Sequence, residues 1–277
     1  MPVNYDTSFV DNLSQNVAVQ FLDRVATSPD FEAFRYPRGE AWESVTWKQA
    51  GDRVRSLAAG LISLGIESEQ RVGIASATRY EWILADLAVM CAGGATTTVY
   101  PTTNADDVAY ILGDSECRIV FAEDDEQLAK LVEHKSSLPH LMKVVTFDGA
   151  ADGDWVITLD ALAELGDAYL AEHPDVVETT AKEISPDALA TLIYTSGTTG
   201  RPKGVRLRHK SWVYEGEAIK VQDILDESDL QFLWLPMSHS FGKVLLSAQL
   251  ACGFATAIDG RVDKIVENCA TVKPTFM

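Results

Sequence analysis

A glycine-rich stretch, residues 194–204, combines conformational freedom, hydroxyl donors and one lysine in the sequence YTSGTTGRPKG. It follows an apolar run, ALATLI at 188–193, which has the pattern of a buried strand. Backbone N–H groups freed at the end of a strand can point at an anion, and short hydroxyl side chains add further donors. The pattern therefore predicts a phosphate-binding loop, although most Gly/Ser/Thr clusters are ordinary flexible turns.

The spacing differs from that of the Walker phosphate loop, which places lysine directly after the last glycine, at the start of a helix. Here Arg201 and Pro202 separate Gly200 from Lys203, and the residue before a proline disfavours helical geometry. We therefore expect the loop to run into a second strand, with Lys203 as a point charge for the outer phosphates of a nucleotide. Donors would come from Thr195, Ser196, Thr198 and Thr199, and conformational freedom from Gly197, Gly200 and Gly204.

Alternating strand and helix patterns precede this loop. Apolar strand patterns fall at 71–76, 95–101, 118–123 and 142–148, and helical patterns at 80–93, 106–115 and 125–134. This alternation is typical of an α/β fold with a largely parallel sheet flanked by helices. After the loop, the pattern predicts strands near 204–209, 230–237 and 255–259, with helices between them.

An acidic segment, residues 148–187, interrupts this alternation and contains a single lysine, Lys182. We interpret TLDALAELGDAYL (158–170) as a surface helix and VVETTAKEISPD (176–187) as a linker. This interpretation divides the chain into a first α/β lobe, residues 1–185, and the start of a second α/β lobe, residues 186–277, which carries the loop.

Composition excludes several classes of protein. A hydrophobic fraction of 47% supports a globular core, and a formal charge of −18 opposes binding to nucleic acid or to anionic membranes. No apolar run is long enough to cross a bilayer, and the first residues lack the pattern of a signal peptide. The sequence therefore predicts a cytoplasmic protein without a membrane-spanning segment. The four cysteines lack metal-like or redox-like spacing, so we interpret them as reduced core residues, with metal binding as the alternative.

Residues 194–204 closely resemble the phosphate-binding signature of the AMP-forming adenylating enzymes, the superfamily of acyl-CoA synthetases, adenylation domains and firefly luciferase. Three further stretches are similar to that superfamily: VTWKQAGDRVRSLAAGL (45–61), GGATTTVYPTTNADDVAYIL (93–112) and LPMSHSFGK (235–243). The last matches the motif beside the acyl pocket, so the resemblance implies that His239 lies where a substrate carboxylate meets the nucleotide. Without the resemblance, a lone histidine after a strand is more often structural.

The resemblance implies that a carboxylic acid attacks the α-phosphate of Mg²⁺-bound ATP, giving an acyl-adenylate and pyrophosphate, and that coenzyme A then displaces AMP. It implies catalytic roles for Lys203 and His239 and a Mg²⁺ contact from Thr195. Nucleotide contacts are implied for Thr195, Ser196, Gly197, Thr198, Thr199, Gly200 and Lys203. The apolar helix after LPMSHS looks most like that of long-chain fatty acyl-CoA synthetases, with medium-chain or aryl acids as alternatives. A lipid substrate also implies peripheral contact with a membrane.

The resemblance further implies that these 277 residues form an N-terminal fragment. Members of the superfamily usually continue through an acidic magnesium ligand, an aspartate that holds the ribose, a hinge and a C-terminal domain with a catalytic lysine. We therefore expect the fragment alone to be inactive. Two other functions stay open: a non-catalytic nucleotide-binding module, and a phosphotransferase that would release ADP instead of pyrophosphate.

Overall fold

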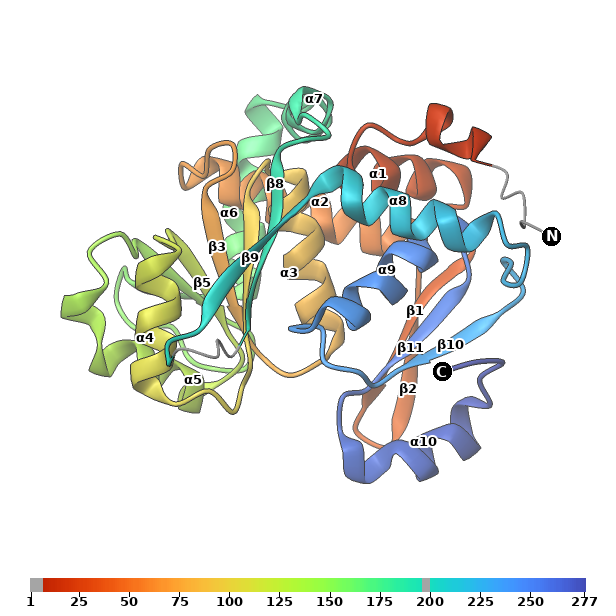
Figure 1. Ribbon diagram of the computed structural model, residues 1–277. Helices are drawn as coiled ribbons and strands as arrows, with labels where there is room; N and C mark the ends of the chain where they lie inside the picture. Colours follow the sequence, from red (N-terminus) through yellow and green to blue (C-terminus); the bar gives the residue numbers. More distant parts are fainter. Residues whose placement is uncertain (1–6, 196–199) are drawn as a thin grey trace.

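The computed structural model describes residues 7–195 and 200–277, which form two β-sheets with helices packed against them (Figure 1). The larger sheet has the strand order β7-β6-β5-β3-β4-β8-β9, and the smaller has the order β10-β11-β1-β2. The larger sheet contains β3 (Arg71–Ala75), β4 (Ala95–Val99), β5 (Ile119–Ala122), β6 (Lys143–Thr146), β7 (Val156–Thr158), β8 (Leu189–Thr195) and β9 (Lys203–Arg208). The smaller sheet contains β1 (Glu32–Arg38), β2 (Ala41–Thr46), β10 (Leu230–Leu233) and β11 (Ala255–Ile258).

The helices predicted at 80–93, 106–115, 125–134 and 158–170 are present within a few residues of those bounds. The helices are α1 (Val17–Thr27), α2 (Trp47–Ser63), α3 (Tyr80–Cys91), α4 (Ala105–Asp114), α5 (Asp125–Glu133), α6 (Leu159–Glu172), α7 (Val176–Glu183), α8 (His209–Lys220), α9 (Ser240–Cys252) and α10 (Ile265–Val272). Polar side chains satisfy free backbone N–H groups at several of their first turns: Thr46 forms a capping box with Gln49, and Asn104, Asp124 and Thr158 each accept from the third residue of a helix.

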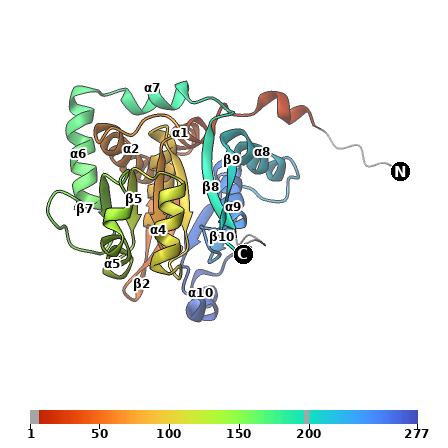
Figure 2. The same ribbon diagram turned by 60° about the vertical axis from the view of Figure 1, so that its left-hand side comes forward.

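All neighbouring strands of the larger sheet are parallel except β8 and β9, which confirms the predicted α/β class. Successive residues of β3 alternate between two apolar clusters: Val72 and Ile74 pack with α2 and α3, whereas Ala75 packs with α4 and α5. Figure 2 shows α4 and α5 on one side of this sheet and α2 on the other. Helices therefore cover both faces, and the carboxyl ends of the parallel strands share one edge.

Both sheets take strands from both sides of residue 185. Strands β8 and β9 complete the larger sheet beside β4, and β11 pairs in parallel with β1 at the opposite end of the chain. The predicted boundary between 1–185 and 186–277 therefore divides the sequence, and each sheet combines strands from before and after it.

The segment interpreted as a linker forms helix α7, so that interpretation is wrong for 176–183. Val177 and Ala181, four residues apart, are fully buried on one face of the helix. The fully buried Asn16 donates its side-chain amide to the Ala181 and Ile184 carbonyls at 2.8 and 3.0 Å. A short apolar face and a distant asparagine thus order a segment whose composition is that of a linker.

Cys91, Cys117 and Cys252 are buried free thiols, and Cys269 is a half-buried one. Burial raises the pKa of the Cys252 thiol to about 11, so it is protonated at neutral pH. In the described ranges, no helix has both the length and the apolar character that a membrane crossing would need.

Candidate functional site

A pocket of about 770 Å³ opens where the loop after β4, the β8–β9 hairpin and the start of α9 meet. In parallel α/β sheets, ligands bind outside the carboxyl ends of the strands, where the connecting loops diverge. Thr195 and His239 both line this pocket, although they come from separate sequence motifs. The structure thus brings together two of the residues that the sequence singled out.

The β8–β9 hairpin places the two described ends of the glycine-rich segment, at Thr195 and Pro202, in the lining of the pocket. Thr195, the last residue of β8, lies opposite Lys203, the first residue of β9. Gly200 has a φ of 114°, a conformation that favours glycine. The loop therefore runs into a strand, as Pro202 predicted. Ser196, Gly197, Thr198 and Thr199 lie outside the described residues, and their nucleotide contacts stay predictions.

Lys203 lies on the face of β9 that faces the pocket. Side chains alternate along a strand, and Val205 and Leu207 line the pocket. Lys203 shares their face, whereas Arg206 and Arg208 belong to the opposite one. Lys203 is exposed at the end of the strand, so its ammonium group can reach a ligand from solvent.

His239 is the N-cap residue of α9, and its Nδ1 accepts the backbone N–H of Phe241 at 3.3 Å. While Nδ1 accepts this bond, the ring proton is on Nε2. The side chain is exposed and lines the pocket. The imidazole can therefore donate from Nε2 to an anionic group bound there.

Helix α4 contacts both ends of the glycine-rich segment through residues that the sequence analysis missed. The Tyr194 hydroxyl donates to Asp114 at 2.6 Å, and burial together with this carboxylate raises the pKa of Tyr194. The Arg201 guanidinium lies 4.9 Å from the centre of the Tyr110 ring. Tyr110 and Asp114 stand four residues apart, a spacing that marks one helix face, but their partners are distant in sequence.

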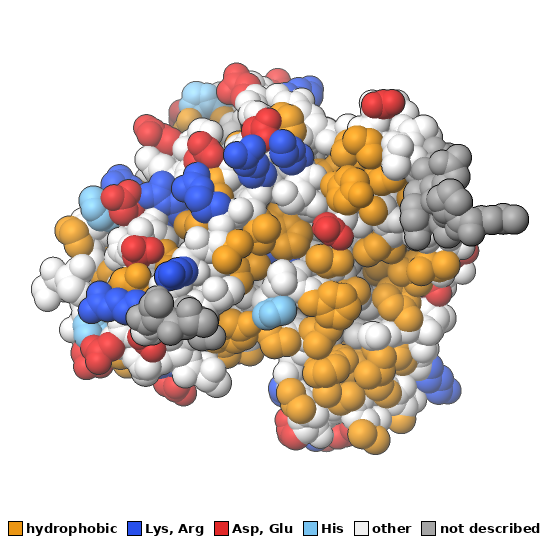
Figure 3. Space-filling view, viewed as in Figure 1, with side chains coloured by type: hydrophobic (Ala, Val, Ile, Leu, Met, Phe, Trp, Pro, Cys, Tyr) orange, Lys and Arg blue, Asp and Glu red, His pale blue; other side chains and the backbone are white. Residues whose placement is uncertain are grey.

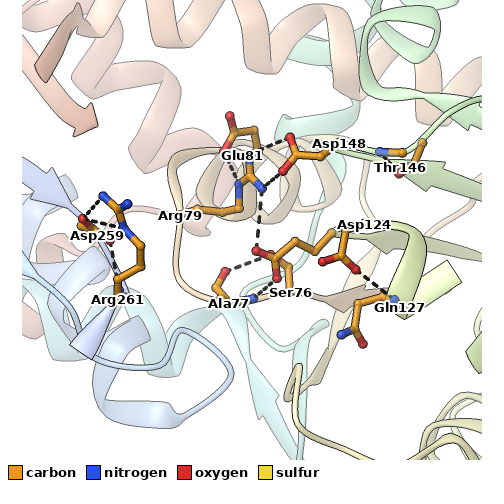
Figure 4. A network of polar contacts seen from close by, with 12 residues as sticks. Ser76, Ala77, Arg79, Glu81, Asp124, Gln127, Thr146, Asp148, Asp259 and Arg261 are labelled. Atoms are coloured by element: carbon orange, nitrogen blue, oxygen red, sulfur yellow. Dashed lines mark hydrogen bonds and ion pairs between the residues drawn. The ribbon is translucent and has the colours of Figure 1, made fainter. Parts of the chain in front are cut away.

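Arg79, just before α3, connects the loops that follow three neighbouring strands (Figure 4). Its guanidinium contacts Glu81 at 2.6 Å, Glu123 at 3.7 Å and the carboxylate of Asp148. Burial lowers the pKa of Arg79, but hydrogen bonds to Asp148 and Glu81 outweigh this and raise it overall. The network holds together the loops at the carboxyl edge of the sheet, and no local sequence pattern connects its members.

Within residues 7–195 and 200–277, no group of three or more histidine, cysteine or acidic side chains is arranged to hold a metal. Thr195, the predicted Mg²⁺ contact, offers one exposed hydroxyl. Magnesium sites that serve nucleotides commonly combine few protein ligands with phosphate oxygens and water. Thr195 therefore fits a role as a magnesium ligand only where phosphate oxygens of a bound nucleotide supply other ligands.

His209, at the start of α8, is fully buried away from the pocket. Its Nδ1 accepts a long hydrogen bond, 3.4 Å, from the backbone N–H of Val17. Burial, and then the charge of Lys243, lowers the pKa of His209 to about 4. The histidine therefore pairs with α1 as a neutral group and has a structural role.

Acid is expected to destabilise the fold through His209. The unfolded chain binds this proton near pH 6.5 and the folded chain only near pH 4, so stability falls as the pH drops through that window. The loss amounts to about 3 kcal/mol at the acid end. His209→Gln, which keeps an acceptor but does not titrate, should weaken this dependence in urea unfolding. Parallel pH profiles for parent and variant would contradict the assignment.

Comparison with known proteins identifies the family. The family model described as AMP-binding enzyme matches residues 21–277. The long-chain-fatty-acid–CoA ligase FadD15 of Mycobacterium bovis is 32% identical over 266 residues, covering 95% of this chain and 43% of that protein. The chain belongs to the family of AMP-binding enzymes. It spans less than half the length of this curated relative.

Solved structures show the same fold. The anthranilate CoA ligase AuaEII in complex with anthranoyl-AMP matches with a TM-score of 0.81 and 20% identity, over 96% of this chain and 50% of that one. A long-chain-fatty-acid–CoA ligase (FadD1) from Archaeoglobus fulgidus matches with a TM-score of 0.78 and 18% identity, over 95% of this chain and 51% of that one. At these identities the likeness concerns the fold.

Proposed function

We propose that this chain supplies the ATP- and acyl-binding part of an AMP-forming long-chain fatty acid–CoA ligase acting in the cytoplasm. The observation that carries the proposal is that Thr195 and His239 line the same pocket, with Lys203 on the pocket side of β9. Family membership and the long-chain-fatty-acid–CoA ligase relative support the same reaction.

The positions of the residues support a role for each of them. Lys203 and the Thr195 hydroxyl would contact the β- and γ-phosphates and a Mg²⁺ ion bound to them, offsetting negative charge that grows on the leaving pyrophosphate. His239 would donate from Nε2 to the carboxylate of the fatty acid and hold it in line with the α-phosphate. ATP, when bound, supplies the phosphorus that the carboxylate attacks, and coenzyme A afterwards receives the acyl group.

An apolar surface beside the pocket favours a long acyl chain over a medium-chain or aryl acid. Hydrophobic side chains gather beside the site over α9, β10 and the C-terminal segment (Figure 3). Phe241, two residues after His239, is 54% exposed, and Val244 and Leu245 are half-buried on the following turn. These side chains offer apolar contacts to a chain whose carboxylate is held at His239. Contact with a membrane surface, from which such an acid could be drawn, is part of the proposal.

Binding of a stable acyl-adenylate analogue tests the proposal without requiring turnover. Adenosine 5′-dodecylphosphate should bind at least about 100-fold more tightly than AMP, since four buried methylene groups already contribute about 3 kcal/mol. Octyl and phenyl esters of AMP should bind more weakly than the dodecyl ester. Equal affinity for AMP and all three esters would support a nucleotide-binding module instead. Where turnover is detected, release of ADP in place of pyrophosphate would support a phosphotransferase.

A further inference from the structure

Lys243 and Asp86 form an ion pair in the core, one helical turn after His239. Lys243 Nζ lies 2.7 and 2.8 Å from the two carboxylate oxygens of Asp86, and the side chains are 4% and 2% exposed. Thr96 on β4 donates its hydroxyl to the same carboxylate at 2.7 Å. The ion pair therefore joins α9 to α3 and to the centre of the larger sheet.

The other groups around Lys243 are aromatic or neutral. The rings of Trp82 and Trp212 lie 5.9 and 5.4 Å from Nζ, and His209 is neutral at pH 7. Burial lowers the pKa of Lys243, and the charge of Asp86 opposes that shift. Replacing a buried ion pair by apolar side chains is often neutral or stabilising, because desolvation of the charges offsets their attraction. Stability alone is therefore a poor explanation for this pair.

The pair acts on a segment that is already held tightly on its other side. The hydroxyl of Thr98 donates to the Ser238 carbonyl at 3.1 Å, so the residue before His239 is tied to β4. Gly242 approaches the backbone so closely that a Cβ there would lie 2.6 Å from the Pro236 carbonyl oxygen. These contacts on one side and the Lys243–Asp86 ion pair on the other leave the first turn of α9 little freedom to rotate or slide.

We propose that the Lys243–Asp86 ion pair is a positioning device for His239. By fixing the first turn of α9 against α3, it sets the direction in which the N-cap imidazole faces the pocket. Lys243 and Asp86 do not line that pocket, so they act through the helix and not on a ligand. The ligand that the imidazole contacts is taken from the proposed function. The position of the imidazole does not depend on that proposal.

The decisive variant replaces the whole polar cluster by apolar groups of similar shape: Lys243→Met, Asp86→Leu and Thr96→Val together, which leaves no buried polar group unpaired. Its melting temperature should stay within about 3 °C of the parent. Lys243→Met alone leaves the Asp86 carboxylate buried without its cation and should lower the melting temperature by about 10 °C. Lys243→Arg should preserve both stability and the position of His239.

The position of His239 is measured without any ligand, in the 277-residue chain. Imidazole nitrogen NMR spectra, assigned with His239→Gln, report the tautomer, and hydrogen exchange reports the capped amide of Phe241. In the triple variant we expect loss of the single tautomer and about fivefold faster exchange at Phe241, as for loss of an N-cap. As a control, replacing the exposed ion pair on α2 by Lys48→Met and Asp52→Leu should change neither signal.

A triple variant with the parental tautomer and exchange rate would overturn the proposal, because the ion pair would then position nothing. An unchanged melting temperature in Lys243→Met would overturn it as well, since the pair would not exist in solution. Because both signals are read without ligand, failure of the alkyl-adenylate binding test would reject the proposed function and leave this inference standing.

Discussion

Lys203→Ala is expected to weaken binding of Mg²⁺-bound ATP by about 10- to 100-fold while leaving adenosine binding unchanged. The lysine begins β9, opposite Thr195, and shares the pocket side of the strand with Val205 and Leu207. In the proposed site its ammonium group would therefore contact the phosphates and not the nucleoside. The loss should be larger for ATP than for AMP, because the outer phosphates carry most of the contact.

Arg206→Ala is the matched control for this prediction. It removes the same unit of charge from the same strand, but from the face that points away from the pocket. Titration calorimetry with ATP, AMP and adenosine should show a loss for Lys203→Ala and parental affinity for Arg206→Ala. If both variants lost ATP affinity equally, the strand would act through its general positive field, and the assigned contact would be wrong.

Local sequence patterns predicted the parts of the site that depend on neighbours in the chain. Pro202 excludes the helix of a Walker loop, and the structure has the antiparallel partner strand that this exclusion implied. The apolar strands gave the parallel sheet, because strands covered on both faces need continuous apolar side chains. His239 was singled out only by the resemblance of LPMSHSFGK to the superfamily's motif, and the fold brings it to the pocket that Thr195 lines.

Contacts between distant segments could not be predicted in the same way. Asp114 and Tyr194 are eighty residues apart in the chain, and Asp86 and Lys243 almost twice that, so no periodicity connects them. Lysine is also rarely buried, so the sequence alone favours a surface position for Lys243. The helix over 176–183 was missed for the same reason, since its apolar face is short and its partner is Asn16.

The packing of α2 against α6 gives the second prediction with a large effect. Gly166 lies where the two helices meet, and a Cβ there would be 1.8 Å from the Ser56 carbonyl oxygen and 2.7 Å from the Gly60 nitrogen. Both atoms belong to backbone, so the helices must separate to admit one methyl group. Gly166→Ala should cost about 3 kcal/mol, or roughly 10 °C in melting temperature.

The same substitution at Gly113 should have the opposite sign. A Cβ at Gly113, also helical, would meet only Leu138 Cδ2 at 3.9 Å, an ordinary contact. Gly113→Ala should therefore stabilise by about 0.5–1 kcal/mol, through the lower conformational entropy of the unfolded chain. Shifts of the same sign in thermal unfolding would show that helix propensity, and not the close approach, governs both positions. Helix α6 covers the sheet face opposite α4, so Gly166→Ala should keep the parental ATP affinity at low temperature. Lys203→Ala should instead lose ATP affinity while its stability stays unchanged.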